Sequence, residues 1–197
     1  MNINKLMGFY ELKAVNIPTV PWKKYSRGTV LDSGILWTVR VALKSGADVS
    51  LPRAVGVTAG EAVEKADAFL GMYGDNGLVI YYPYFIADKS GVIDISSGRT
   101  VIEAVDKDLW NLVTHGRKNV TITIGDSGAS YDGDRSFLPE AELSLLQDSI
   151  SRIKAYYRGL LSEGKSIITE WSFAYSSGID GRPSGEKFLV FYELRSV

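Results

Sequence analysis

The sequence predicts an α+β or mixed α/β fold built in two layers. Segments with helical periodicity are interspersed with short runs rich in β-branched and aromatic residues, which are typical of single strands and hairpins. The 197 residues are enough for one sizeable domain or two small lobes, and their 45% hydrophobic content supports an ordinary globular core. We therefore expect mixed or antiparallel sheets with packed helices in two small lobes.

Composition excludes several classes of function. With 22 basic and 23 acidic residues the net charge is -1, so no global field attracts nucleic acid or an anionic membrane. Cysteine is absent and His115 is the only histidine, which excludes disulfides, thiolate metal sites and multi-histidine metal centres. No apolar stretch approaches the roughly 20 residues of a membrane span. We expect no nucleic-acid partner, no membrane partner and a cytoplasmic location.

The first elements are a short helix and a buried strand. Residues 4–15 have the apolar spacing of an amphipathic helix, which Asn16 and Pro18 end. Residues 36–43 form a compact apolar run bounded by glycines, as expected of a buried strand. Arg40 lies in the middle of this run, where a charge normally requires a partner.

A second helix is predicted to begin after Thr58. Thr58 and Glu61 have the spacing of a capping box, and apolar residues follow with helical period. Residues 74–77 (Gly-Asp-Asn-Gly) turn the chain and are a candidate lobe boundary. The apolar run at 78–86 predicts a strand that breaks near Pro83, because proline cannot donate to a ladder.

The segments after residue 90 again predict strands interspersed with helical segments. Three further strands are expected, at residues 91–95, 100–105 and 119–124. Residues 107–114 predict a helical turn, and the Gly-, Ser- and Asp-rich residues 125–134 predict a mobile loop, so that 125–138 is the second candidate lobe boundary. From about Pro139 to Gly164 the apolar residues trace one face of a helix.

A charged hairpin is predicted at the end of the chain, from residues 166–175 and 186–195. Alternation turns Glu170 away from its aromatic neighbours. If Tyr175 pairs with Glu186 across the loop, Glu170 lies on the same face of the hairpin as Glu193 and Arg195. Carboxylate oxygens suit Mg²⁺, and arginine matches phosphate oxygens in two-pronged fashion. The alternative is a surface ion pair.

Common nucleotide and hydrolase motifs are missing. The sequence contains no Gly-x-x-x-x-Gly-Lys-Ser/Thr loop, no Gly-x-Gly-x-x-Gly after a strand and no Gly-x-Ser-x-Gly elbow. The densest aromatic group, residues 81–85 (Tyr-Tyr-Pro-Tyr-Phe), is either core or one wall of a pocket for a flat ring.

Short motifs nevertheless occur in a familiar order along nearly the whole chain. They are Lys5 about twelve residues before the turn at 17–22, the Val-Arg pair at 39–40, the strand 80–86 leading into Ser-Gly-Val at 90–92, Ile-Glu-Ala-Val at 102–105 with Leu-Val-Thr-His-Gly at 112–116, Ile-Thr-Glu-Trp at 168–171 and Tyr-Glu-Leu-Arg at 192–195. In this order the chain resembles a shortened ATP-grasp domain. The resemblance is closest to the nucleotide-binding domain of pyruvate phosphate dikinase and phosphoenolpyruvate synthase.

The resemblance implies a single ATP-grasp-like unit over residues 1–197 that binds ATP and Mg²⁺. It assigns Lys5 and Arg40 to the ATP phosphates, Tyr82, Tyr84 and Glu103 to the adenosine pocket, Glu170 and Glu193 to Mg²⁺, and Glu193 with Arg195 to the phosphate end, with Arg40 and Arg195 as the catalytic groups. Phosphoryl transfer needs cations and donors more than covalent chemistry, which agrees with these residue types. It also implies that these groups converge on one cleft.

The sequence departs from the family pattern at several positions. Ile168 stands where the family has an acidic residue, Glu193 replaces its glutamine, Ser196 replaces its proline, and residues 51–56 stand for its Gly-rich phosphate-covering loop. The family's swivelling phosphohistidine domain and pyruvate-binding barrel have no counterpart here, so a complete dikinase reaction is not expected.

Structural readings remain open for three of the same residues. Lys5 is alternatively a solvated residue on an amphipathic helix. Arg40 is alternatively the structural partner of Glu170, and Glu103 is alternatively a solvent-facing strand residue.

Three functions follow from these observations. The first is an ATP-dependent phosphotransferase or ligase that acts on an unknown small-molecule acceptor. The second is a catalytically degenerate nucleotide- or small-ligand-binding module that works with a partner protein, which Ile168 and the shortened loop favour. The third is an α+β protein-interaction domain whose exposed aromatic residues form an interface.

Overall fold

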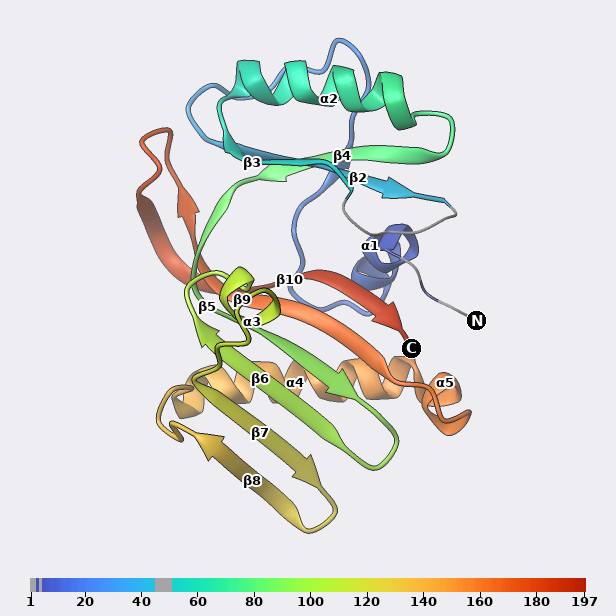
Figure 1. Cartoon of the computed structure of the whole chain (residues 1–197), viewed down its shortest axis with the longest axis vertical. Coiled ribbons are helices and arrows are strands. Elements are labelled where there is room, and N and C mark those ends of the chain that lie inside the picture. Colours follow the sequence, from blue (N-terminus) through green and yellow to red (C-terminus); the bar gives the residue numbers. More distant parts are fainter. Residues whose placement is uncertain (1–2, 4, 45–50) are drawn as a thin grey trace. The chain divides into compact units, whose positions relative to one another are not determined.

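The computed structural model describes residues 3, 5–44 and 51–197, and the fold is α+β (Figure 1). The chain divides into two compact units. Unit 1 comprises Met1–Thr19, Ala87–Phe173 and Leu189–Val197, and unit 2 comprises Val20–Ile86 and Ala174–Phe188. Residues 74–77 fall inside unit 2 and residues 125–138 inside unit 1.

Unit 2 contains a four-stranded sheet of order β1-β4-β2-β3 with α2 on one face (Figure 1). The elements are β1 Lys23–Lys24, β2 Trp37–Leu43, β3 Arg53–Val57, α2 Ala59–Tyr73 and β4 Gly77–Pro83. Alternate strand residues pack against α2, among them Val39, Val41 and Val79, which meet Ala66 and Phe69 of the helix. The side chains between them in sequence therefore face away from α2.

Local chemistry explains where the elements of unit 2 begin and end. The hydroxyl of Thr58 accepts from the backbone N–H of Glu61, and the Glu61 carboxylate accepts from the backbone N–H of Thr58, which confirms the predicted capping box. The break predicted near Pro83 is also confirmed, because β4 ends at Pro83 and the next strand begins at Phe85.

Unit 1 is centred on a six-stranded sheet of order β10-β9-β5-β6-β7-β8. The strands of this sheet are β5 Phe85–Ile95, β6 Thr100–Asp106, β7 Val120–Gly125, β8 Gly128–Gly133, β9 Ile167–Ser177 and β10 Pro183–Ser196, and the helices of the unit are α1 Lys5–Ala14, α3 Trp110–Val113, α4 Glu140–Tyr156 and α5 Arg158–Ser162. Residues 85–86, 174–177 and 183–188 of β5, β9 and β10 belong to unit 2. The ladders that join β5, β6, β7 and β8 are antiparallel.

The core of unit 1 joins the sheet to α4. Ile93, Ile102 and Trp171 of the strands belong to one buried cluster with Leu146 and Ile153 of the helix. Gly91 is required beneath the Trp171 ring, because a Cβ at this position would collide with that ring and with the backbone carbonyl of Glu103. The sheet therefore has one face committed to the core.

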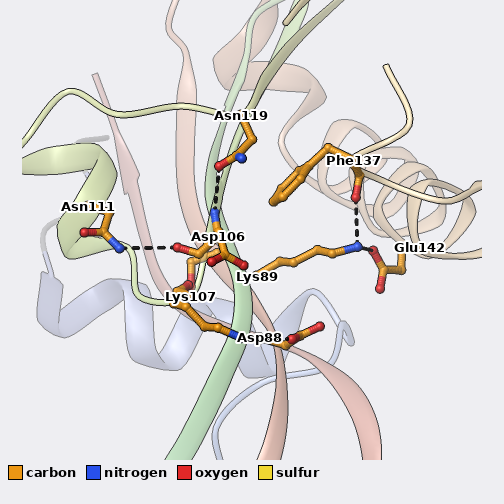
Figure 2. Close-up of polar contacts among 9 residues, drawn as sticks. Asp88, Lys89, Asp106, Lys107, Asn111, Asn119, Phe137 and Glu142 are labelled. Carbon is orange, nitrogen blue, oxygen red and sulfur yellow. Dashed lines mark hydrogen bonds and ion pairs between the residues drawn. The ribbon is translucent and has the colours of Figure 1, made fainter. Parts of the chain in front are cut away.

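A buried ion pair links β5 to the first turn of α4 (Figure 2). The ammonium of Lys89 lies 2.7 Å from a carboxylate oxygen of Glu142 and donates to the backbone carbonyl of Phe137 at 2.8 Å. The two side chains are only 16% and 9% exposed. Lys107 and Asp88 form a second pair nearby, at 3.6 Å, with Lys107 largely exposed.

Three expectations about local structure are corrected. Residues 125–134 are not only a loop, because Gly125 pairs with Gly128 in a tight β7–β8 hairpin and β8 occupies residues 128–133. The helix predicted from Pro139 to Gly164 is two helices, since Pro139 is the N-cap residue and the chain leaves helical geometry at Tyr157. The strands β1 and β3 lie in segments for which no strand was predicted.

None of the helices in the described part of the chain has the length and apolar content needed to cross a membrane.

Candidate functional site

The predicted site residues belong to two groups, one in each unit. Unit 2 contains Arg40, Tyr82 and Tyr84, and unit 1 contains Lys5, Glu103, Glu170, Glu193 and Arg195.

Arg40 lies at the centre of β2 and faces away from α2. Its sequence neighbours Val39 and Val41 are buried in the α2 core, so alternation turns the half-buried Arg40 to the opposite face. In the ladders of the sheet, Arg40 is directly opposite Arg53 of β3 and Ile80 of β4. Arg53 was missed by sequence reasoning because residues 51–56 were interpreted as a loop.

The register extends this arrangement into a row across the whole sheet of unit 2. Lys24 of β1 is directly opposite Ile80, so Arg53, Arg40, Ile80 and Lys24 share one face. We call these four residues the basic row. Three of its four side chains are cationic, which favours binding of an anion with several charges.

The two tyrosines predicted to line a pocket are largely packed into the protein. Tyr82 shares the face of Arg40, because it pairs with Thr38, but it is only 4% exposed and its ring stacks on Phe85 with centroids 6.5 Å apart. Gly56 has a φ of +66°, and a Cβ added to it would lie 3.3 Å from the ring of Tyr84, so both the backbone conformation and the space favour glycine. The aromatic segment therefore contributes to the interior of unit 2.

Glu170 lies on the face of the unit 1 sheet that turns away from the core. Trp171 is fully buried in the core cluster, and Ser172 forms a 2.8 Å hydroxyl–hydroxyl hydrogen bond with Ser90. Ser90 in turn donates to the backbone carbonyl of Lys107. Alternation places the half-buried Glu170 with Ser172, as the sequence predicted.

Where the two ends of the terminal hairpin meet, the register differs by two residues from the predicted one, which would set Ser166 opposite Arg195. A shift of two residues leaves the face of each residue unchanged. Ser166 and Val197 exchange two backbone hydrogen bonds of 2.9 and 3.0 Å. Leu189 and Phe191, and then Leu194, belong to the core cluster, so the alternation along β10 is interrupted between Phe191 and Leu194. The hydroxyl of Thr169 also donates to the backbone carbonyl of Glu193 at 2.7 Å, so Glu170 and Glu193 lie on adjoining stretches of β9 and β10. Glu193 is 8% exposed, whereas Arg195 is exposed.

Glu103 also faces away from the core and contacts a lysine. Ile102 and Ala104 on either side of it are fully buried. Its carboxylate, 39% exposed, lies 3.8 Å from the ammonium of Lys118, which also lies 3.4 Å from a carboxylate oxygen of Asp132. The structure thus gives Glu103 a partner within the protein.

Two polar atoms on the same side of the sheet as Glu103 are buried without a hydrogen-bond partner. They are Oδ1 of Asp94 and Oγ1 of Thr121. Thr121 is directly opposite Glu103, and Asp94 lies between the core residues Ile93 and Ile95, so both face away from the core. Sequence patterns gave no signal for either residue, because alternation within a strand assigns a face and not a hydrogen-bond partner. We call Asp94, Glu103, Thr121 and Glu170 the acidic face of unit 1.

Lys5 lies in α1, but its side chain is outside the described residues. Within residues 3, 5–44 and 51–197 no group of three or more histidine, aspartate or glutamate side chains is arranged to hold a metal ion. Two carboxylates fit a Mg²⁺ ion that takes its remaining ligands from phosphate oxygens and water.

The comparisons with known proteins identify the fold. No protein-family model matches the sequence, and no curated protein matches it. Among solved structures, N5-carboxyaminoimidazole synthetase from Staphylococcus aureus complexed with ADP aligns with 98% of this chain at a TM-score of 0.52 and 10% identity. D-alanine-D-alanine ligase from Helicobacter pylori aligns with 98% at 0.52 and 10%. N5-carboxyaminoimidazole ribonucleotide synthetase from Thermus thermophilus aligns with 98% at 0.52 and 14%.

This chain spans only 43%, 50% and 44% of those three proteins. The similarity is one of fold, because the identities are far too low to carry an activity across. The α+β architecture of this chain is therefore ATP-grasp-like, as the sequence motifs implied.

Proposed function

We propose that this protein binds ATP with Mg²⁺ and acts as an ATP-dependent ligase or phosphotransferase on a small-molecule acceptor. The observation that carries the proposal is Arg40, a charged residue at the centre of a sheet in an ATP-grasp-like fold, with Arg53 directly opposite. Guanidinium groups match phosphate oxygens in two-pronged fashion, and two of them on one face suit an anion with several charges.

The proposed roles follow the chemistry of each group. Arg40, Arg195 and Lys5 neutralise phosphate oxygens, and Glu170 with Glu193 holds Mg²⁺ together with those oxygens. Tyr82, Tyr84 and Glu103 line the adenosine pocket. Mg²⁺ held by these carboxylates would supply positive charge to the transferring phosphoryl group, and Arg40 and Arg195 would hold that group in line with the acceptor. We place this activity in the cytoplasm.

The closer assignment, to the dikinase-like branch of the fold, rests on the motifs at both ends of the chain. It favours phosphoryl transfer over ligation. The order of Lys5, Arg40, Glu170 and Arg195 supports it.

A second candidate is a catalytically degenerate nucleotide- or small-ligand-binding module that works with a protein partner. Three observations favour it. Ile168 replaces an expected carboxylate, Glu103 is paired with Lys118, and Tyr82 is almost fully buried. Each of them removes a group that a catalytic site would use.

Calorimetric titration with ATP and Mg²⁺ tests both candidates. We expect binding that weakens at least about tenfold in Arg40→Ala, because a charge-assisted contact is lost. Arg27→Ala, on an exposed loop of unit 2, is the control and retains the wild-type affinity. No heat at millimolar ATP contradicts both candidates.

ATP turnover with a panel of small acceptors separates them. Consumption of ATP that Arg40→Ala abolishes supports the enzyme, and tight binding without consumption supports the binding module.

A further inference from the structure

Arg40 and Arg53 are nearest neighbours in the β2–β3 ladder. Directly opposite residues of an antiparallel pair have Cβ atoms roughly 4.5–5.5 Å apart and side chains on the same face. Ala54, the next residue after Arg53, is buried in the α2 core, so Arg53 faces away from α2. Two guanidinium groups therefore emerge side by side from one face of this sheet.

The backbone of β3 fixes which side chain lies opposite Arg40. Val39 pairs with Ala54 and Trp37 pairs with Val57, so β3 has one extra residue between Ala54 and Val57, which is a β-bulge. Gly56, with φ of +66°, lies within this irregular stretch. The regular pairing beyond the bulge then brings Arg53, and not a neighbour, opposite Arg40.

Arg40 is half-buried, whereas Arg53 is exposed and accessible to a ligand. A single phosphate group offers one anionic centre, whereas a di- or triphosphate offers two or three. Each guanidinium binds phosphate oxygens through two parallel N–H donors.

We propose that Arg53 is a second phosphate-binding residue, which acts with Arg40 to select nucleoside di- and triphosphates over monophosphates. This inference rests on the proposed nucleotide function. It adds a residue to the site and assigns a substrate class to the arginine pair.

The test compares the affinities of four proteins for ATP, AMP and inorganic tripolyphosphate. These are the wild type, Arg53→Met, Arg53→Lys and the control Lys23→Met. Lys23 is exposed and pairs with Tyr81, so it lies on the α2 face of the same sheet, opposite to Arg53. The control therefore removes one positive charge from unit 2 without touching the arginine pair.

Arg53→Met is expected to weaken ATP and tripolyphosphate binding about tenfold and AMP binding less than about twofold, because only the polyphosphates engage both guanidinium groups. Arg53→Lys recovers part of the loss, since it keeps the charge but not the two-pronged geometry. Lys23→Met matches the wild type for all three ligands. Circular dichroism confirms that the variants retain the fold.

Three results overturn the inference in distinguishable ways. Wild-type ATP affinity in Arg53→Met, in a protein that does bind ATP, removes Arg53 from the site and leaves the proposed function standing. Equal losses for ATP and AMP remove the selectivity. If the wild type binds tripolyphosphate through Arg53 but does not bind ATP, the arginine pair is an anion site and the nucleotide function is wrong.

Discussion

Unit 1 and unit 2 place ionisable groups of opposite charge on the sheet face that turns away from the core. In unit 2 that face contains Arg40, Arg53 and Lys24 of the basic row. In unit 1 it contains the carboxylates of Glu103 and Glu170, with an unpartnered oxygen of Asp94. Of the groups proposed to bind phosphate, Arg40 and Arg53 thus come from unit 2, whereas Lys5 and Arg195 come from unit 1, as do the proposed metal ligands.

In both units the period-2 alternation of the strands sets core residues on one face of the sheet and ionisable residues on the other. Residues on the core face determine whether a unit folds, and the ionisable groups lie on the other face, some of them beside buried residues such as Ile80 and Tyr82. Substitutions on the core face are therefore expected to unfold one unit, and substitutions on the polar face to alter ligand binding.

The largest effect is expected from the buried ion pair of unit 1. Lys89→Met removes the ammonium partner of the Glu142 carboxylate and lowers the free energy of unfolding by about 3 kcal/mol, because a buried carboxylate loses its ion pair. Chemical denaturation measures this change. Lys107→Met, at a largely exposed ion pair in the same region, is the control and costs less than about 1 kcal/mol. Similar losses in the two variants contradict the assignment of Lys89 to the core.

A second change tests the packing of the unit 1 core face. Gly91→Ala introduces a methyl group against the Trp171 ring and lowers the free energy of unfolding by about 1–3 kcal/mol through overpacking. Tryptophan fluorescence reports the displaced ring during thermal unfolding. Gly98→Ala adds the same atom where no other atom lies within 4 Å, so it leaves the stability nearly unchanged. A stable Gly91→Ala protein means that Trp171 does not lie against this strand.

A third prediction compares one tyrosine in each unit. The hydroxyl of Tyr157 donates to the carboxylate of Glu11 at 2.8 Å, and that of Tyr25 donates to Asp67 at 3.0 Å. Burial, followed by these carboxylates, raises the pKa of both tyrosines above the ordinary value near 10. Because the folded state holds these protons more tightly, their contribution to stability is full below about pH 10 and is lost as the pH rises further.

Tyr157→Phe and Tyr25→Phe test this pH dependence. Each is expected to lower stability by about 1–2 kcal/mol at neutral pH and to flatten the alkaline loss of stability. Denaturant titrations from about pH 7 to about pH 11 measure both effects. Tyr10→Phe, on an exposed tyrosine, leaves the curve unchanged. If stability falls with rising pH in Tyr157→Phe and Tyr25→Phe just as it does in the wild type, the prediction is wrong.

The smallest effect is expected at the capping box of α2. Thr58→Ala removes the hydroxyl that accepts from the Glu61 N–H and destabilises unit 2 by about 1 kcal/mol. The hydrogen bonds from Thr58 hold the pKa of Glu61 below its usual range, so this stability is present above the unfolded pKa and lost as the pH falls. Thr58→Ser keeps the cap. If hydrogen exchange at the start of α2 is equal in the two variants, the cap does not stabilise this helix.

Most of the fold was predictable because its signals are local. The Thr58 capping box, the break after Pro83 and the glycine-bounded apolar run at β2 each depend on a few neighbouring residues. The β7–β8 hairpin was not, because its turn formers resemble those of a loop and only the pairing partner distinguishes the two. The short β1 and β3 are likewise defined by their neighbours in the sheet.

The site was predictable only in part. Arg40 and Glu170 could be assigned to a strand and a face by alternation, and the structure agrees with both assignments. Arg53 could not, because its position opposite Arg40 depends on a bulge in β3. The same holds for the pairing of Glu103 with Lys118, which requires β6 and the segment before β7 to be neighbours.

The most direct test separates the proposed phosphate contact of Arg40 from the proposed metal contact of Glu170. The affinities of the wild type, Arg40→Met and Glu170→Gln for ATP are determined by calorimetry with Mg²⁺ and with a chelator. We expect Arg40→Met to weaken the binding of ATP both with Mg²⁺ and with the chelator, because the substitution removes a phosphate contact. Glu170→Gln is predicted to lose only the part of the affinity that depends on Mg²⁺. Wild-type affinity in both variants, or no binding of ATP to the wild type, contradicts the account.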